Sequence, residues 1–311
     1  MGKIDAKTYE YMSDNAHFAD VFNYYLYNGK KVIDPDKLKE MDTRELSMPY
    51  GDDNVSDTIQ KYRDILKYVC AMYDDNAAYL ILGIENQAEE HYAMPVKNMI
   101  YDAAQYDKQV KRAASSHRNS EESKEINTGE FLSGFYKDDK LLPVITLVMY
   151  WSADEWKAPM TLHEMFSVND RSILKFVPDY KINLVAPYNM SDEDFEKFET
   201  TLAKALKFIK YSKDDLALQN VLDNDKVYEN IDRETAELIR DVTNSEMEFE
   251  EGQVINVCLA EQNMKKKAVR ESAIETAKVL INMGKNTVEE ISKATKLPID
   301  EIRKLAEPKM Q

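Results

Sequence analysis

Two acidic residues and a glutamine indicate where this chain could do chemistry. Glu85 and Gln87 close the apolar run LILGIENQ, and Asp64 lies 21 residues before Glu85. Side chains two apart on a strand share one face, so Asn86 would point to the other face. Carboxylates that converge on a divalent cation can promote phosphodiester hydrolysis, because the cation polarises the phosphate and helps to form hydroxide from water. Alternatively, Asp64 is an acid at a strand end that pairs with Arg63 or Lys67.

A β-hairpin would bring these residues together. The segment YRDILKYVCAMYDDNAAYLILGIENQ divides into a strand at about residues 63–73, a polar turn at 74–76 and a second strand at about 77–86. In an antiparallel pair the start of the first strand lies beside the end of the second, so Asp64 is expected next to Glu85. The second strand is apolar on both faces, which is typical of a central strand covered on both sides.

The elements around the hairpin predict a mixed α/β core. A helix is expected at about 14–29, because apolar residues recur there at helical spacing, with Ser13 or Asp14 as its cap and Gly29 at its end. A second helix is expected from Pro95 to about Ser116. Strands are expected in LLPVITLVMYW and KINLVAP, a short helix near 161–167, and one long amphipathic helix in 191–212. Helices follow from there, and residues 34–60 and 117–140 are expected to be polar, turn-rich surface segments.

Composition restricts the class of protein. The chain has 311 residues, of which 43% are hydrophobic and 32% charged, as in a soluble globular protein. It has no run of eighteen apolar residues, so no membrane helix is expected. Cys70 and Cys258 lie far apart in apolar surroundings, which favours reduced cysteines in a cytoplasmic protein. The net charge of −16 argues against simple electrostatic attachment to nucleic acid, although residues 264–311 carry eleven Lys or Arg and seven Asp or Glu.

Four longer stretches resemble a known family. HFADVFNYYLYNGKKVI, MPYGDDN leading into QKYRDILK, YLILGIENQAEEHYAMPVKNMIYDAAQYDKQV and FLSGFYKDDKLLPVITLVMYW are similar to the recombination-promoting nuclease / putative transposase family, YhgA-like. This family lies within the PD-(D/E)XK nuclease superfamily. The resemblance covers about residues 14–210, and the long central stretch is its specific part, since the bare D…ExQ spacing alone is a weak signal.

The resemblance implies a restriction-endonuclease-like fold, with a mixed sheet flanked by helices and a helical C-terminal region. It also implies DNA cleavage assisted by Mg²⁺ or another divalent cation such as Mn²⁺ or Ca²⁺, with Asp64 and Glu85 as metal ligands. Gln87 stands where many superfamily members have Lys, and glutamine can orient water but brings no charge. Lys67, or more plausibly Lys97 on the next helix, would supply that charge.

Five further residues are candidates for contacts with metal, phosphate or DNA. Asp20, on the first helix, is either a third metal ligand or a solvated surface acid. Tyr101 and Gln109, on the helix of Lys97, would be available to hold phosphate or water and so to contact DNA. Trp151 and Trp156 either stack on bases or pack at a strand end.

The C-terminal segment also admits two functions. Thr287–Glu290 form a capping box, Gly284 ends the preceding helix, and the short helices resemble a helix-turn-helix. On a DNA-binding interpretation Lys296, Arg303 and Lys304 contact the duplex backbone. Alternatively, the apolar residues of these helices form a small core used for self-association, which the acidic residues on the basic face favour.

These observations predict a nuclease-like domain at 1–212, a helical extension at 213–263 and a small helix-turn-helix-like module at 264–311. The predicted function is metal-dependent endonucleolytic cleavage of double-stranded DNA, linked to recombination or mobile elements. The alternative is a catalytically inactive DNA-binding or assembly protein that retains the fold. Transposition itself is poorly supported, since no separate acidic triad for strand transfer is evident.

Overall fold

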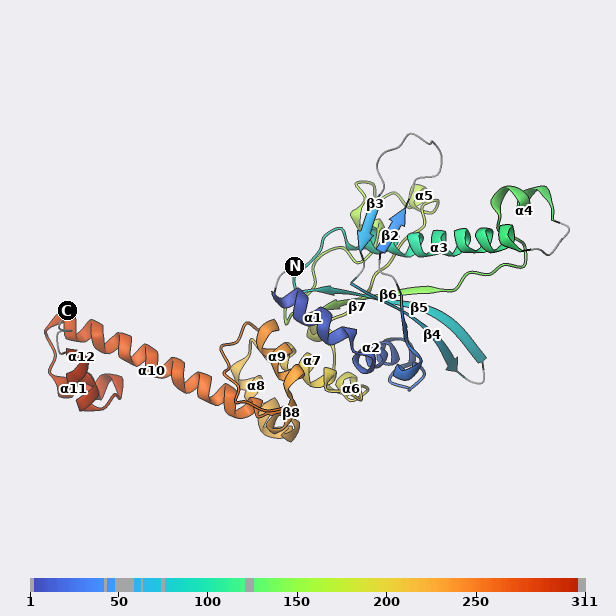
Figure 1. The fold of residues 1–311 in the computed structure, drawn as a ribbon. Helices are drawn as coiled ribbons and strands as arrows, with labels where there is room; N and C mark the ends of the chain where they lie inside the picture. The colour runs from blue at the N-terminus through green and yellow to red at the C-terminus, as the bar shows by residue number, and fades with distance from the viewer. Residues whose placement is uncertain are drawn as a thin grey trace.

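A five-stranded mixed sheet forms the centre of the computed structural model (Figure 1), which describes residues 3–41, 44–47, 59–62, 64–73, 76–120 and 126–306. The strand order is β1–β4–β5–β6–β7; β1, β4 and β5 are antiparallel neighbours, and β6 and β7 run parallel to β5. The bounds are β1 (Lys39–Glu40), β4 (Ile65–Tyr73), β5 (Asn76–Gln87), β6 (Val144–Tyr150) and β7 (Asn183–Val185). The sheet and its helices confirm the predicted α/β nuclease-like architecture.

The predicted hairpin is β4 paired with β5. Ile65 lies opposite Ile84 and Tyr73 opposite Asn76, while positions 74 and 75 of the predicted turn lie outside the described residues. Residues 80–86 of β5 are buried, as expected for a central strand. From β5 the chain crosses through α3 (Met94–Asn119) to the parallel strand β6, so α3 begins close to the end of β5.

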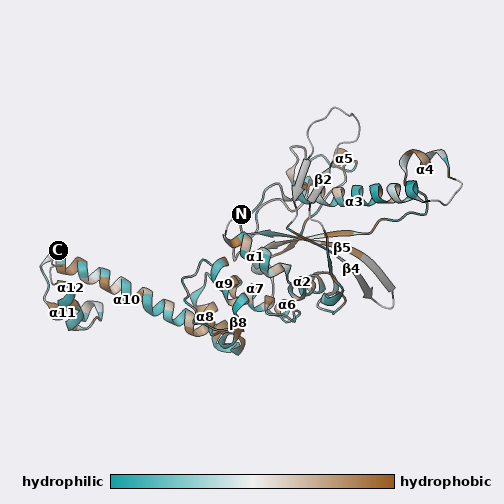
Figure 2. Cartoon of the chain, viewed as in Figure 1, coloured by the Kyte–Doolittle hydropathy of each residue, from teal (hydrophilic) through white to brown (hydrophobic). Residues whose placement is uncertain are grey.

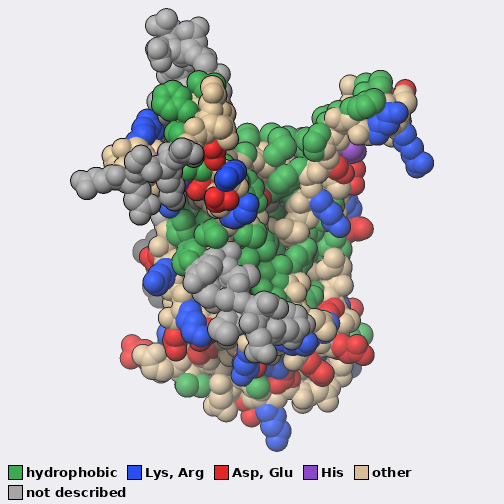
Figure 3. All heavy atoms as spheres, turned by 90° about the vertical axis from the view of Figure 1, so that its right-hand side faces the viewer, with side chains coloured by type: hydrophobic (Ala, Val, Ile, Leu, Met, Phe, Trp, Pro, Cys, Tyr) green, Lys and Arg blue, Asp and Glu red, His purple; other side chains and the backbone are tan. Residues whose placement is uncertain are grey.

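The two faces of the sheet pack against different helices. On one face Leu82, Ile84 and Leu147 join a core built with α1 (Lys3–Ser13), α2 (Asn15–Tyr27), α7 (Leu202–Tyr211) and α9 (Arg233–Val242). α3 covers the other face, where Met94 packs with Val148. Figure 2 shows hydrophobic residues in the middle of the sheet and many hydrophilic residues along α3. Figure 3, which views the side opposite the C-terminal arm, shows hydrophobic side chains exposed among charges of both signs.

The ends of α2 follow from local sequence. The Asp14 side chain accepts hydrogen bonds from the backbone N–H groups of Ala16 (2.8 Å) and His17 (3.2 Å), so Asp14, and not Ser13, caps the helix. Asn28 (φ 52°) and Gly29 (φ 84°) end it in the left-handed conformation. A Cβ atom on residue 29 would lie 2.8 Å from the backbone oxygen of Lys197, so the site requires glycine.

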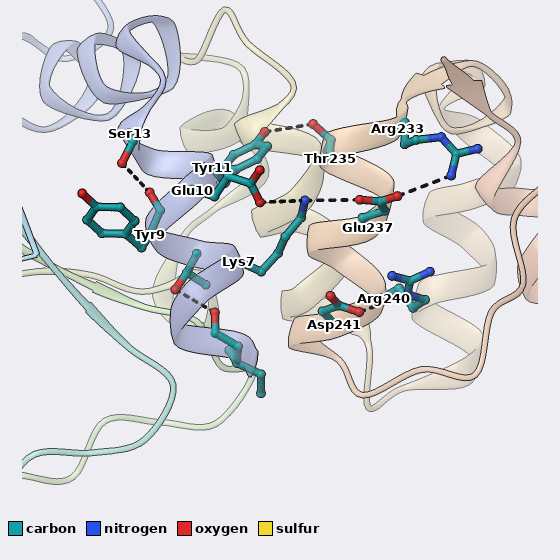
Figure 4. A network of polar contacts seen from close by, with 12 residues as sticks. Lys7, Tyr9, Glu10, Tyr11, Ser13, Arg233, Thr235, Glu237, Arg240 and Asp241 are labelled. Atoms are coloured by element: carbon teal, nitrogen blue, oxygen red, sulfur yellow. Dashed lines mark hydrogen bonds and ion pairs between the residues drawn. The ribbon is translucent and has the colours of Figure 1, made fainter. Parts of the chain in front are cut away.

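The helix α1 was not predicted from the sequence, and it packs against α9, which lies more than 200 residues later in the chain. Its Lys7 pairs with Glu237 of α9 (Nζ–Oε2 3.2 Å), which also pairs with Arg233 (3.3 Å; Figure 4). The hydroxyl groups of Tyr11 and Thr235 share a buried hydrogen bond of 2.9 Å. α1 also packs against β4 and β5, so it connects the hairpin to the helices from which the C-terminal arm starts.

The prediction of one long helix at 191–212 is wrong, because the segment forms two helices. The structure divides it into α6 (Asp192–Phe195) and α7, because residues between them turn toward Asp20. Segments predicted to lack regular structure also contain short elements. These are α4 (Thr128–Ser133) and the antiparallel pair of β2 (Arg44–Ser47) and β3 (Ile59–Tyr62). The helix predicted at 161–167 forms only as a short 3-10 turn, and α5 (Arg171–Leu174) follows it.

The C-terminal helices form an arm with a small packed end (Figure 1). α10 runs unbroken across the boundary predicted at 264, and Gly284 (φ 62°) and the capping box of Thr287 and Glu290 form as expected. Ile291, Leu297 and Ile302 pack with Ala277 of α10 into a cluster of their own. The bounds are α8 (Asp215–Asn224), β8 (Ile231–Asp232), β9 (Val254–Ile255), α10 (Val257–Met283), α11 (Val288–Thr295) and α12 (Ile299–Ala306).

Within the described ranges, no helix combines the length and apolar character needed to cross a membrane.

Candidate active site

The hairpin places Asp64 and Glu85 at neighbouring positions on two strands. Since Ile65 lies opposite Ile84, one further step of the same register places Asp64 opposite Glu85. The contact is supported by a hydrogen bond in which the backbone N–H of Asn86 donates to Oδ2 of Asp64 at 2.8 Å. The two acids predicted from the sequence therefore lie together at the carboxyl end of β5.

Glu85 is held by a lysine from the next helix. Its side chain is fully buried, and its Oε2 lies 2.7 Å from Nζ of Lys97 in the first turn of α3. A buried carboxylate needs such a partner, because removal of a charge from water is costly unless an opposite charge compensates it. Lys97 keeps a quarter of its side chain exposed and lies over the ring of Tyr101 at 5.7 Å, so it connects the buried acid with the surface.

Burial also alters the acidity of Asp64. Loss of water around the carboxyl raises its pKa, and the hydrogen bond from Asn86 and the charge of Lys97 offset part of that rise. The carboxylate of Asp5, in the first turn of α1, raises the pKa further. Asp64 thus sits in an environment that disfavours its charge unless a cation binds.

This raised pKa leads to a testable effect on stability. A raised pKa means that the folded state binds the proton more tightly than the unfolded chain. The associated stability is therefore present below the unfolded pKa and is lost as pH rises through the folded one. Asp64→Asn cannot ionise, so it avoids this loss of stability at neutral pH, and its amide oxygen can still accept the hydrogen bond from Asn86. We therefore expect the Tm of this variant near pH 7.5 to exceed that of the metal-free wild type by on the order of 2 °C. The difference should shrink as pH falls through the raised pKa, which thermal unfolding at several pH values measures. An equal difference at all pH values would contradict this assignment.

Gln87 and Asn86 lie on opposite faces of β5. Gln87 pairs in register with Tyr150 on the face of Glu85, and its Nε2 donates to the backbone oxygen of Asn86 at 2.8 Å. Asn86 accepts a hydrogen bond from Nε1 of Trp151 (2.9 Å) on the other face, as the alternation predicts. Trp151 and Trp156 are both buried, which favours the packing interpretation of these tryptophans.

The structure separates the remaining candidates on α3. Tyr101 is buried directly beneath Lys97. Gln109 lies about 18 Å from Lys97 along the helix axis, given a rise of about 1.5 Å per residue. Its amide is bonded to the backbone of Leu142, accepting from N–H at 2.7 Å and donating to the carbonyl at 3.2 Å. Gln109 therefore joins α3 to the chain entering β6, away from the acids.

Other predicted residues lie elsewhere in the molecule. Lys67 is buried on the face of β4 opposite to Leu66, and its Nζ donates to the backbone oxygen of Ser13 at 2.6 Å. It is thus directed toward α1 and α2 and not toward Glu85. Lys296 ends α11, and Arg303 and Lys304 belong to α12; all three lie at the far end of the arm (Figure 1).

Asp20 is not brought to the acidic pair. It is buried in α2 and accepts hydrogen bonds from the N–H groups of Glu199 (3.0 Å) and Thr200 (2.8 Å) and from the Thr200 hydroxyl (2.6 Å). These bonds satisfy backbone groups at the break between α6 and α7. The solvated-surface interpretation is also excluded, since only 5% of Asp20 is exposed.

Asp20→Ala is therefore expected to act on stability. Loss of hydrogen bonds to a buried charge should lower the free energy of unfolding by about 2–3 kcal/mol, measured by urea unfolding. Metal-dependent cleavage by the folded variant should stay within a few-fold of wild type. Strongly reduced cleavage with unchanged stability would instead support Asp20 as a third metal ligand.

Two carboxylates can hold a hard divalent cation only with help from other ligands. Across the described residues, no group of three or more His, Cys, Asp or Glu is arranged to bind a metal. Mg²⁺ commonly binds one or two protein carboxylates and completes its shell with water and substrate phosphate. The donor set of Asp64 and Glu85 fits that pattern, and burial that disfavours the negative charge of Asp64 would favour a compensating cation.

Two residues near this site were missed by the sequence reasoning. Asp5 lies in a helix whose sequence gave no clear signal, and Asn98 lies directly after Lys97. Asn98 could have been recognised, because it occupies the inward face of an amphipathic helix where an apolar residue is expected.

Comparison with known proteins gives one result. The family model described as "Putative transposase, YhgA-like" matches residues 31–237, which span β1 to β7 and both acids of the hairpin. The match begins after α1 and α2. No curated protein and no solved structure matches the chain.

Proposed function

Because the chain belongs to the YhgA-like putative transposase family, we propose that it is a metal-dependent DNA endonuclease whose site is formed by Asp64, Glu85 and Lys97. The observation that carries this proposal is Glu85, a fully buried carboxylate at the end of an apolar strand, opposite Asp64 and 2.7 Å from a lysine. An acid in such a position is costly for a structural role alone.

In the proposed reaction, Asp64 and Glu85 would hold Mg²⁺, which when bound polarises the phosphate and lowers the pKa of a water molecule. Lys97 is partly exposed, so its ammonium group can reach a phosphate and stabilise the negative charge that develops on it. Gln87 lies at the rim on the same face and can orient water by hydrogen bonding. The substrate would be double-stranded DNA, in a recombination or mobile-element setting. Self-association through the C-terminal helices stays a prediction.

A second function has one observation in its favour. Gln87 provides no charge, and its amide donates to its own strand's backbone. A site in which this position brings no charge would make the protein a catalytically inactive DNA-binding or assembly factor that retains the fold.

Plasmid nicking separates the two functions. Wild type, Asp64→Asn and Glu85→Gln would be incubated with supercoiled plasmid and Mg²⁺, Mn²⁺ or Ca²⁺, with EDTA as the control. Cleavage that requires a divalent cation and is lost in both variants supports the endonuclease. Equal nicking by all three proteins would reveal a contaminant, and DNA binding without any cleavage would favour the inactive alternative.

A further inference from the structure

The inward face of α3 carries a row of polar residues. Asn98, Asp102, Gln105 and Gln109 recur at the spacing of one helix face, and the first three are buried. A helix that covers a sheet normally presents apolar residues at these positions. The partners of these side chains should therefore explain why they are polar.

Structural bonds account for two members of this row. Asp102 accepts hydrogen bonds from the hydroxyl groups of Thr146 (2.7 Å) and Tyr180 (2.6 Å). Gln109 is paired with the backbone of Leu142. Asn98 differs, because its side chain is 0% exposed and neither its amide oxygen nor its amide nitrogen has a hydrogen-bond partner among the described residues.

The neighbours of Asn98 place it above the candidate site. One turn earlier, Met94 packs with Val148, the residue opposite Glu85 in the β5–β6 register. One turn later, Asp102 is bonded to Thr146, which lies opposite Gly83. Asn98 therefore lies over the step from Gly83 to Glu85. Gly83 contributes no side chain at this step, and the adjacent residue of the helix is Lys97.

We infer that Asn98 is a positioning residue that holds the carboxylate of Glu85 when Lys97 turns to a phosphate. When Lys97 turns to a phosphate, its 2.7 Å ion pair with Glu85 is weakened, and the carboxylate oxygen that does not bind the cation can then accept a hydrogen bond from a second donor. The Asn98 amide is a neutral donor next to Lys97 on the helix, and it can take this role without adding charge. This inference rests on the proposed function and adds a residue to its site.

A substitution that removes only the hydrogen-bonding groups tests the inference. Asn98→Leu has similar size, and replacing an unpaired buried amide with an apolar group is expected to raise the Tm of the metal-free protein by about 2–4 °C. If Asn98 positions Glu85, the same variant should bind Mn²⁺ about 10–100-fold more weakly by titration calorimetry and cleave plasmid more slowly by a similar factor. A merely structural role would raise Tm and leave the affinity for Mn²⁺ unchanged.

Controls keep the result interpretable. Gln105→Leu changes another buried amide of the same row two turns further along and should retain the affinity for Mn²⁺. Asn98→Ala, which cannot introduce a clash, should weaken Mn²⁺ binding like Asn98→Leu even if leucine does not fit. Wild-type affinity for Mn²⁺ in both Asn98 variants overturns the inference. If Glu85→Gln also binds Mn²⁺ as well as wild type, then the proposed metal site itself fails.

Discussion

Replacing Glu85 with glutamine is expected to abolish Mg²⁺-dependent cleavage, with a fall in rate of at least about 100-fold. Glutamine preserves the size of the side chain but removes the charge that would bind the cation. The ion pair with Lys97 Nζ, now 2.7 Å long, is also lost, although the partly exposed ammonium group can turn to water. Single-turnover cleavage of supercoiled plasmid measures the rate.

Glu89→Gln is the matched control, because it makes the same chemical change at an exposed position four residues further along. It should cleave at the wild-type rate. If Glu85→Gln retained wild-type cleavage in a preparation that requires Mg²⁺, the chemistry would lie at a different site.

Replacing Phe18 with alanine is expected to produce the largest loss of stability among the changes considered. Phe18 is fully buried in α2, its ring centroid lies 4.9 Å from that of Phe22, and Nζ of Lys67 lies 5.1 Å from its ring centroid. Its removal leaves a cavity between α2 and the sheet and should lower the free energy of unfolding by about 3–5 kcal/mol. Urea unfolding followed by circular dichroism measures this change.

Phe131→Ala provides the same substitution on the surface, since Phe131 in α4 is 73% exposed. Its effect should stay within about 0.5 kcal/mol. Comparable losses for both variants would mean that α2 does not form part of the main core.

Much of the fold could be predicted because its central elements have strong local signals. The strand β5 is a long apolar run, and α2 has helical spacing, an N-terminal cap and a terminal glycine. The helix α1 lacked such signals, and its position depends on contacts with α9 that lie more than 200 residues away in sequence, such as Lys7 with Glu237. The break between α6 and α7 also depends on a distant residue, Asp20, which no helical pattern can reveal.

The candidate site could be predicted where local rules determine it and not where distant segments do. Strand alternation and hairpin pairing are local rules, so they placed Glu85, Asn86 and Asp64 correctly. The preference for Lys97 over Lys67 agrees with the observed ion pair. Asp20 and Gln109 could not be assigned from sequence, because the backbone groups that occupy their side chains belong to remote segments.

The helix α10 is unbroken over its whole length, so it holds the C-terminal helices away from the main core. Its 27 residues extend about 40 Å at a rise of about 1.5 Å each. The first turn of α10 packs in the main core and its last turns pack with α11 and α12, so only the middle of the helix separates the two clusters. Inserting one whole turn there would move the terminal helices outward by about 5.4 Å and keep their orientation.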